Sequence, residues 1–221
     1  MNKIKTFLLQ QLFKPSLIGF FINPFFLGRS AMYINVKKLS KHISGKTLDV
    51  GCGSKPYIKL FNNVSEYTGM DIEQSGHKHQ YSSIDVFYDG KTFPFENDSF
   101  DSLVFFEVLE HVFNPEIFFN EIKKVVKPGG NCLVTIPFIW GEHEQPFDFA
   151  RYSSFGLNHL FKTNGFEMIP TKQIKGSLPA TFSALEQIMV FRFSGGRIAG
   201  TRTGDRFHIL FIDHNFTLYK H

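Results

Sequence analysis

The sequence predicts an α/β protein with a mostly parallel sheet flanked by helices. Short apolar segments of strand length alternate with helical patterns over residues 47–169, and this alternation is typical of parallel strands joined by right-handed crossovers. The first two segments end in a glycine-rich turn and in an acidic residue, at the strand ends where open α/β sheets bind ligands. The 221 residues, 43% hydrophobic and 20% charged, suffice for one well-buried domain with appendages.

Strands are expected where short apolar runs stop at a glycine, an acidic residue or a turn. The first run, 47–50, ends at Gly51-Cys52-Gly53, and the second, 66–72, carries Asp71 near its end. Further strands are expected at 81–86, 100–106 and 130–136. Another is expected at 166–169, after a helix that Asn164-Gly165 ends.

Helices are expected between these strands and before them, at 32–42, 115–126 and 153–163. The clearest is 115–126, where apolar residues recur at helical spacing and Lys127-Pro128-Gly129-Gly130 ends the pattern. The chain thus divides into three expected parts. They are a basic N-terminal helical segment at 1–46, a core domain at 47–175, and a C-terminal helix with the last strand at 176–221.

The C-terminal part has several interpretations. Residues 177–193 predict an apolar helical insertion, which could serve as a lid over the substrate, a dimer surface or a membrane-facing element. One of the short apolar runs at 207–212 and 216–219 is expected to form the last, antiparallel strand. The sequence leaves the oligomeric state open.

Charge is distributed unevenly along the chain. Residues 1–48 hold eight Lys or Arg and no acid, whereas residues 49–170 hold nine basic and seventeen acidic residues, a balance of −8. Residues 171–221 return to seven basic and three acidic, a balance of +4. An acidic centre between basic ends does not suit a nucleic-acid groove, so no nucleic-acid partner is expected.

The N-terminal segment is apolar without being a membrane span. Pro15 and Pro24 break the apolar run at 7–28, so neither a spanning helix nor a secretory signal is predicted. Two interpretations remain, an interfacial helix on an anionic membrane and a cap that closes over the site. Because Cys52 and Cys132 lack metal-ligand spacing, we expect no metal site and a cytoplasmic location, with peripheral contact at the inner face of the membrane under the first interpretation.

The glycine-rich turn after the first strand indicates a nucleoside cofactor. Gly51-Cys52-Gly53 lets the backbone bend sharply and approach a ligand. Asp71 ends the next strand 22 residues after Asp49, where a carboxylate can accept hydrogen bonds from both ribose hydroxyls. Pro56 stands where a dinucleotide site wants a third small residue. This argues against NAD and favours S-adenosyl-L-methionine, which has no phosphate.

Further motifs carry a family resemblance. Asp85-Val86, the run 93–101 from Phe-Pro-Phe to Phe-Asp, Leu109-Glu110-His111 and Lys127-Pro128-Gly129-Gly130 follow in that order. With them, residues 47–137 resemble the type 11-like class I methyltransferases, which include the ubiquinone and menaquinone methylating enzymes. The resemblance implies a Rossmann-like, mostly parallel seven-stranded sheet and S-adenosyl-L-methionine as the cofactor.

The resemblance also implies roles for individual residues. Asp49 and the turn after it would hold the methionine end, Asp71 the ribose, and Asp85 the adenine amino group, while Phe106 would border the sulfonium. Glu110 and His111 serve either the start of the following helix or the site. The implied cofactor-binding residues are Asp49, Gly51, Cys52, Gly53, Asp71, Ile72, Asp85, Val86 and Phe106.

The loop after the fifth strand is expected to face the methyl acceptor. Residues 143–152 read His-Glu-x-Pro-x-Asp-Phe-x-Arg-Tyr, which resembles a bacterial branch found with cell-surface polysaccharide enzymes. His143 is the first candidate for a general base, because imidazole exchanges a proton near neutral pH. Asp148 would orient it or act itself, and Arg151 would pair with an acidic group of the acceptor. Alternatively, Asp148 and Arg151 form a structural ion pair that holds the loop.

Two function classes follow from these patterns. The first is a methyltransferase that acts on a small or lipid-linked acceptor, with a saccharide of a cell-surface glycan pathway as one option. The second is a non-catalytic module that keeps the methyltransferase fold within a membrane-associated biosynthetic complex. The intact motif acids Asp49, Asp71 and Asp85 favour the enzyme.

Overall fold

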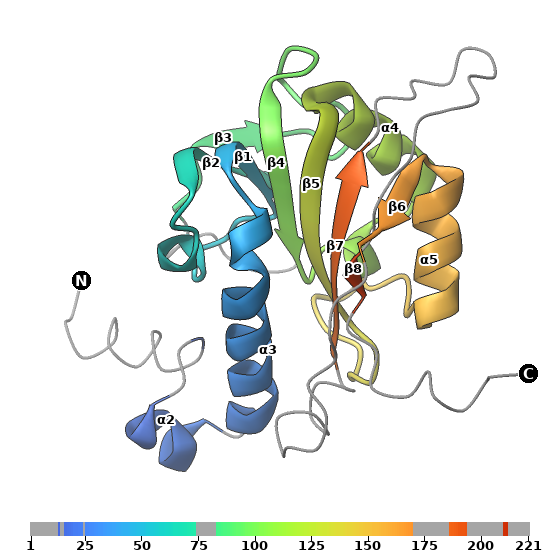
Figure 1. The fold of residues 1–221 in the computed structure, drawn as a ribbon. Coiled ribbons are helices and arrows are strands. Elements are labelled where there is room, and N and C mark those ends of the chain that lie inside the picture. Colours follow the sequence, from blue (N-terminus) through green and yellow to red (C-terminus); the bar gives the residue numbers. More distant parts are fainter. Residues whose placement is uncertain are drawn as a thin grey trace, which may run out of the picture.

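A single twisted sheet organises the protein (Figure 1). The computed structural model describes residues 13, 16–23, 25–73, 83–169, 186–193 and 210–211. In this part of the chain the strand order is β3-β2-β1-β4-β5-β7-β6, with the two-residue β8 paired to β7. β7 runs antiparallel to its neighbours, while β3, β2, β1, β4 and β5 are parallel to one another. The predicted mostly parallel, seven-stranded sheet is confirmed.

The element bounds follow the predicted order of the core. The strands are β1 Gly45–Val50, β2 Val64–Ile72, β3 Val86–Tyr88, β4 Phe100–Phe106, β5 Val126–Pro137, β6 Phe166–Met168, β7 Glu186–Phe193 and β8 Leu210–Phe211. The helices are α2 Leu17–Ile22, α3 Phe26–Leu39, α4 Pro115–Val125 and α5 Ser154–Thr163, with short 3₁₀ turns η1 Ser40–His42, η2 Ile58–Leu60 and η4 Leu109–His111.

Two apolar clusters cover the two faces of the sheet. Neighbouring residues of a strand point to opposite faces, so Leu103 joins one cluster and Val104 the other. The first cluster packs the sheet against α4 and α5 through a set of phenylalanines that includes Phe119 and Phe161, whose rings meet edge to face at 4.6 Å. The second packs it against α3. Much of the large phenylalanine content therefore serves the core.

One predicted helix is wrong where the structure describes it. Residues 186–193, the end of the helix predicted at 177–193, form β7 instead, and residues 177–185 lie outside the described part of the chain. β7 pairs with β5 along Glu186 to Arg192 on one edge, and with β6 along Phe191 to Phe193 on the other. A short continuous apolar run such as residues 188–191 fits a buried strand as well as a helix, and hydrogen bonding on both edges of β7 decides for the strand.

This result also corrects the position of the last antiparallel strand. It was expected at 207–212 or 216–219, but β7 takes that place in the sheet order. Of the first run the structure describes Leu210–Phe211, which form a short strand beside β7. Residues 216–219 lie outside the described residues. The third strand lies at 86–88 rather than 81–86. The remaining core elements agree with their predicted positions to within a few residues at each end.

The N-terminal helices α2 and α3 differ in how far they are buried against the sheet. α3 packs through Met32, Val36 and Leu39, whereas α2 exposes Phe20 and Phe21 at 57% and 82%. Among the helices that the structure describes, none combines the length and apolar character that crossing a membrane requires.

A pair of isoleucines on α4 tests the core. Ile122 is 0% exposed and Ile117 is 48% exposed. We expect Ile122→Ala to lower the free energy of unfolding by about 2–5 kcal/mol, because it removes buried methylenes and leaves a cavity. Ile117→Ala should change it by less than about 1 kcal/mol. Urea unfolding followed by circular dichroism measures both, and equal losses would contradict the assignment of faces on α4.

Candidate active site

A cavity of about 360 Å³ opens at the carboxyl ends of the parallel strands. This is the edge where α/β sheets bind ligands, and the volume lies within the usual range for small-molecule sites. The predicted site residues that line it are Asp49, Gly51, Cys52, Gly53, Phe106 and His143. They come from the turn after β1, the end of β4 and the loop after β5, so the structure brings together residues from three predicted motifs.

The turn after β1 depends on glycine. Gly51 has a φ of +68°, and a Cβ there would lie 2.5 Å from Cγ2 of Val108. Gly53 also has a positive φ, and the space beside its Cα is open. The backbone N–H groups of Gly51 and Cys52 both donate to the carbonyl of Met70, at 2.8 and 3.1 Å. The bend is therefore tied to the end of β2, and it presents bare backbone to the cavity.

Asp49 places a buried carboxylate at this turn. Its side chain is 2% exposed, and the hydroxyl of Tyr67 donates a hydrogen bond of 2.7 Å to its Oδ2. Burial raises the pKa of Asp49 to about 7, although the hydrogen bond from Tyr67 acts in the opposite direction. The carboxylate can therefore gain much from a cationic ligand that restores its charge.

Asp71 links the glycine turn to the end of β2. Its Oδ2 accepts from the N–H of Gly53 at 3.0 Å, and its Oδ1 accepts from the N–H of Ile72 at 2.9 Å. Each oxygen keeps a second lone pair for a ligand. Asp71 is thus hydrogen-bonded to Gly53, which lines the cavity, but Asp71 itself does not line it.

The residues predicted to bind adenine lie close together but outside the cavity. Asp85 accepts from the N–H of Gly69 at 2.6 Å and from the ammonium of Lys55. Ile72 and Val86 stand at the end of β2 and the start of β3, beside Asp71 and Asp85, and like them do not line the cavity. The segment 74–82 between them lies outside the described residues. Adenine and ribose contacts therefore stay predictions.

In the loop after β5, Asp148 binds both neighbouring candidates. Arg151 holds it with two hydrogen bonds, Nη1 to Oδ1 at 2.5 Å and Nη2 to Oδ2 at 2.7 Å. This pairing lowers the pKa of Asp148 well below its usual range. Arg151 also donates to the carbonyls of Trp140 and Gly141. These contacts correspond to the loop-holding alternative, and direct contact of Asp148 or Arg151 with an acceptor stays a prediction.

His143 faces the cavity with Asp148 behind it. The N–H of His143 donates to Asp148 Oδ2 at 2.9 Å, and its ring Nδ1 lies 3.2 Å from the same oxygen. Its Nε2 points toward Glu110, with 4.0 Å between Nε2 and Oε1. The orienting role predicted for Asp148 is consistent with this geometry, and the role of His143 as a base stays a prediction.

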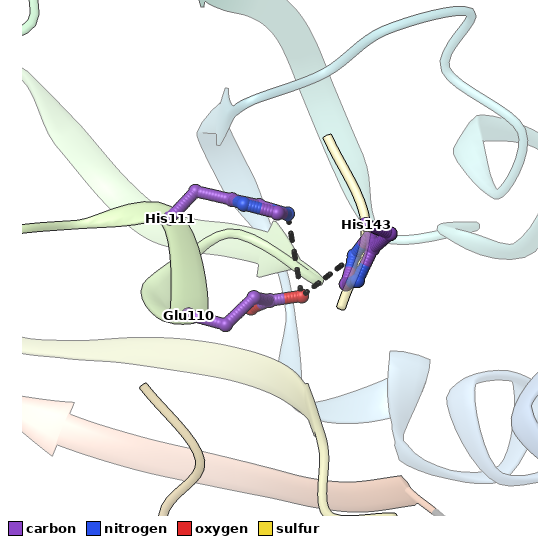
Figure 2. Close-up of side chains that lie close together, drawn as sticks. All are labelled: Glu110, His111 and His143. Carbon is purple, nitrogen blue, oxygen red and sulfur yellow. Dashed lines mark ion pairs between the residues drawn. The ribbon is translucent and has the colours of Figure 1, made fainter. Parts of the chain in front are cut away.

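The turn after β4 adds Glu107, which no predicted motif assigned to the site, to Glu110 and His111, which the sequence assigned either to a helix start or to the site. Glu107 and His111 line the cavity, and Glu110 lies directly behind His111 with 0% exposure. Burial and the neighbouring Glu107 raise the pKa of Glu110 well above its usual range. Figure 2 shows the carboxylate of Glu110 joined by dashed lines to the rings of both His111 and His143. In the sequence, Glu107 could have been recognised from its place in the charged run 107–111, which directly follows β4 at the ligand-binding edge of the sheet.

Comparisons with known proteins agree on the core domain. Residues 48–134 match a methyltransferase domain family. A probable S-adenosylmethionine-dependent methyltransferase of Mycolicibacterium smegmatis is 28% identical over 147 residues, which are 61% of this chain and 57% of that protein. The phthiotriol/phenolphthiotriol dimycocerosates methyltransferase 1 of Mycobacterium ulcerans is 32% identical over 103 residues, 42% of this chain and 38% of that protein. The chain spans less than two thirds of the length of either relative.

A solved structure extends the likeness to the fold. An S-adenosylmethionine-dependent methyltransferase from Mesorhizobium loti matches with a TM-score of 0.56 and 12% identity, over 75% of this chain and 99% of that one. At this identity the likeness concerns the fold alone. Together with the domain match and the sequence relatives, it confirms the class I methyltransferase fold and S-adenosylmethionine as the cofactor. The polysaccharide-associated branch stays a prediction.

The raised pKa of Asp49 predicts a pH dependence of cofactor binding. The predicted role of Asp49, pairing with the ammonium of the cofactor, requires the ionised carboxylate, and burial raises the pKa of Asp49 to about 7. Affinity should therefore rise with pH, by about tenfold between pH 6 and pH 8. Calorimetric titration across this range measures it. Asp49→Asn should bind weakly with a flatter profile, and an unchanged profile in this variant would exclude Asp49 as the source.

Proposed function

We propose that this chain, built on a class I methyltransferase domain with S-adenosylmethionine as its cofactor, methylates a hydroxyl group of a small or lipid-linked acceptor. The carrying observation is that the glycine turn, Asp49 and His143 line one cavity. The open backbone at Gly53 and the buried carboxylate of Asp49 fit a cationic, phosphate-free nucleoside. The proposed activity follows from a cofactor-binding turn and a candidate general base that line the same cavity.

The residues around the cavity support an in-line transfer. When bound, S-adenosylmethionine supplies the methyl group, and the electron pair of the broken S–CH₃ bond stays on sulfur. Asp49 holds the ammonium, so that the sulfonium is directed toward the part of the cavity that His143 lines. His143 takes the proton of the acceptor hydroxyl as the new O–CH₃ bond forms, with Asp148 supporting the ring through Nδ1. Phe106 and Trp140 help to exclude water from the cavity.

Several observations favour a lipid-linked acceptor at a membrane surface. The exposed apolar side chains Ile18, Phe20, Phe21 and Phe25 lie on or next to α2, and residues 1–48 hold no acid. The ring of Phe25 contacts Trp140, which lines the cavity, with centroids 4.9 Å apart. One relative is named for a dimycocerosate acceptor, which is lipid-like. We propose that α2 rests on the inner face of an anionic membrane, with a saccharide carried on a lipid as the acceptor.

Binding of the cofactor separates this function from the non-catalytic alternative. In calorimetry the protein should bind S-adenosylmethionine, and Asp71→Ala should weaken binding by tenfold or more, since charged hydrogen bonds contribute about 1.5–3 kcal/mol. Glu66→Ala, which removes an exposed acid from the other end of β2, is the matched control. A folded wild-type protein that does not bind the cofactor would favour the non-catalytic module.

The membrane surface has a separate test. The double variant Phe20→Ser and Phe21→Ser should lose most of its binding to vesicles of anionic phosphatidylglycerol in co-sedimentation, because it removes the apolar contact of α2 with the interface. Phe155→Ser, on the exposed side of α5, should bind as wild type does. Equal binding by all three proteins would contradict a role of α2, and cofactor binding would be unaffected by this outcome.

A further inference from the structure

Three side chains converge beside the cavity, in the turn after β4 and the loop after β5. Glu110 and His111 belong to the turn η4 after β4, and His143 comes from the loop after β5. One ligand atom from each lies within 4.8 Å of the other two. Oε1 of Glu110 is 3.7 Å from Nε2 of His111 and 4.0 Å from Nε2 of His143. Figure 2 shows both rings turned toward this carboxylate.

Glu110 is the unusual member of this cluster. Its side chain is 0% exposed, and neither carboxylate oxygen accepts a hydrogen bond from another residue in the part of the chain that the structure describes. A buried carboxylate without partners is costly. The backbone around it is held firmly, because its carbonyl accepts from the N–H groups of Phe149 and Ala150 at 2.8 and 3.2 Å. The carboxylate is therefore kept at the cluster and is open to a positive ligand.

Both histidines are oriented as metal ligands usually are. Nδ1 of His111 lies 2.7 Å from the carbonyl of Phe147, and Nδ1 of His143 lies 3.2 Å from Oδ2 of Asp148. A proton on each Nδ1 satisfies these acceptors and leaves the lone pair of each Nε2 facing Glu110. Metal-bound histidines commonly donate their second N–H to a carbonyl or carboxylate in this way, which fixes the ring and its tautomer.

We propose that Glu110, His111 and His143 bind one divalent transition-metal cation, with Zn²⁺ as the best-suited ion. Two imidazoles and one carboxylate form a set that suits zinc and its neighbours better than Mg²⁺, which prefers oxygen ligands. Around a tetrahedral zinc, ligand atoms stand about 3.4 Å apart. The separations between Glu110 and the two rings, 3.7 and 4.0 Å, need only small side-chain shifts to reach this. This site differs from the sequence expectation of no metal.

The position of the site suggests its use. Three protein ligands leave a coordination position open, and His111 and His143 both line the cavity. Under the function proposed above, on which this step rests, the open position takes the acceptor oxygen and makes its hydroxyl proton easier to lose. The proton then leaves to water. In the zinc-bound protein the cation replaces the general-base role given to His143 above, because a metal-bound imidazole with a protonated Nδ1 has no lone pair for the proton. Cation binding itself does not depend on the methyl acceptor.

Direct metal titration tests the site. Untagged protein is stripped with a chelator, dialysed and titrated with Zn²⁺ alone, by calorimetry and by elemental analysis after gel filtration. We expect one tightly bound zinc per chain and much weaker binding of Mg²⁺. Glu110→Gln, His111→Ala and His143→Ala should each weaken zinc binding by tenfold or more. His159→Ala removes an exposed imidazole from α5 and should bind zinc as wild type does.

The outcomes distinguish the metal site from the proposed function. Because Glu110 is buried, circular dichroism must show that its variant folds. If the Glu110 variant does not fold, His143→Ala still tests the site, because its side chain is 29% exposed and lies in a loop. Absence of stoichiometric zinc in the folded wild-type protein, or zinc binding undiminished by both histidine variants, would overturn the site. Titration of the metal-free protein with S-adenosylmethionine reports on the proposed function separately, so either result can fail without the other.

Discussion

The tie between the glycine turn after β1 and the end of β2 is the constraint on which the site depends. The N–H groups of Gly51 and Cys52 share the carbonyl of Met70, and the N–H of Gly53 is paired with the Asp71 carboxylate. Buried donors must be paired, so these bonds hold the bend in place once the parallel strands align. The bend in turn sets one wall of the cavity and leaves Asp49 at its base.

The part of the cavity lined by His143 depends on a second set of contacts. Arg151 holds Asp148, and Asp148 accepts from the backbone of His143. The same loop docks on the turn after β4, where the carbonyl of Glu110 accepts from two of its N–H groups. Packing the loop onto this turn brings His143 to Glu110 and His111. A buried carboxylate is tolerated there at a cost, which fits a place for a cation better than a purely structural role.

The parts of the fold that sequence patterns predicted are those controlled by local sterics and periodicity. The turn at Gly51 needs a positive φ, and the amphipathic pattern of α4 has one apolar face, so both could be recognised from neighbouring residues alone. The prediction failed at residues 186–193. There the apolar residues fit either period. Hydrogen bonding to β5 and β6, whose paired residues lie about fifty to sixty and about twenty-five positions away in the chain, decided for a strand.

For this protein, the sequence by itself determined the parallel core, the cofactor and the acids at the ends of the first strands, because each is encoded within a short segment. Tertiary structure decided which side chains meet. The sequence assigned Glu110 either to a helix start or to the site, and its burial beside His111 and His143 favours the second. The convergence of residues that lie some thirty positions apart depends on loop docking and long-range packing, for which a local pattern has no signal.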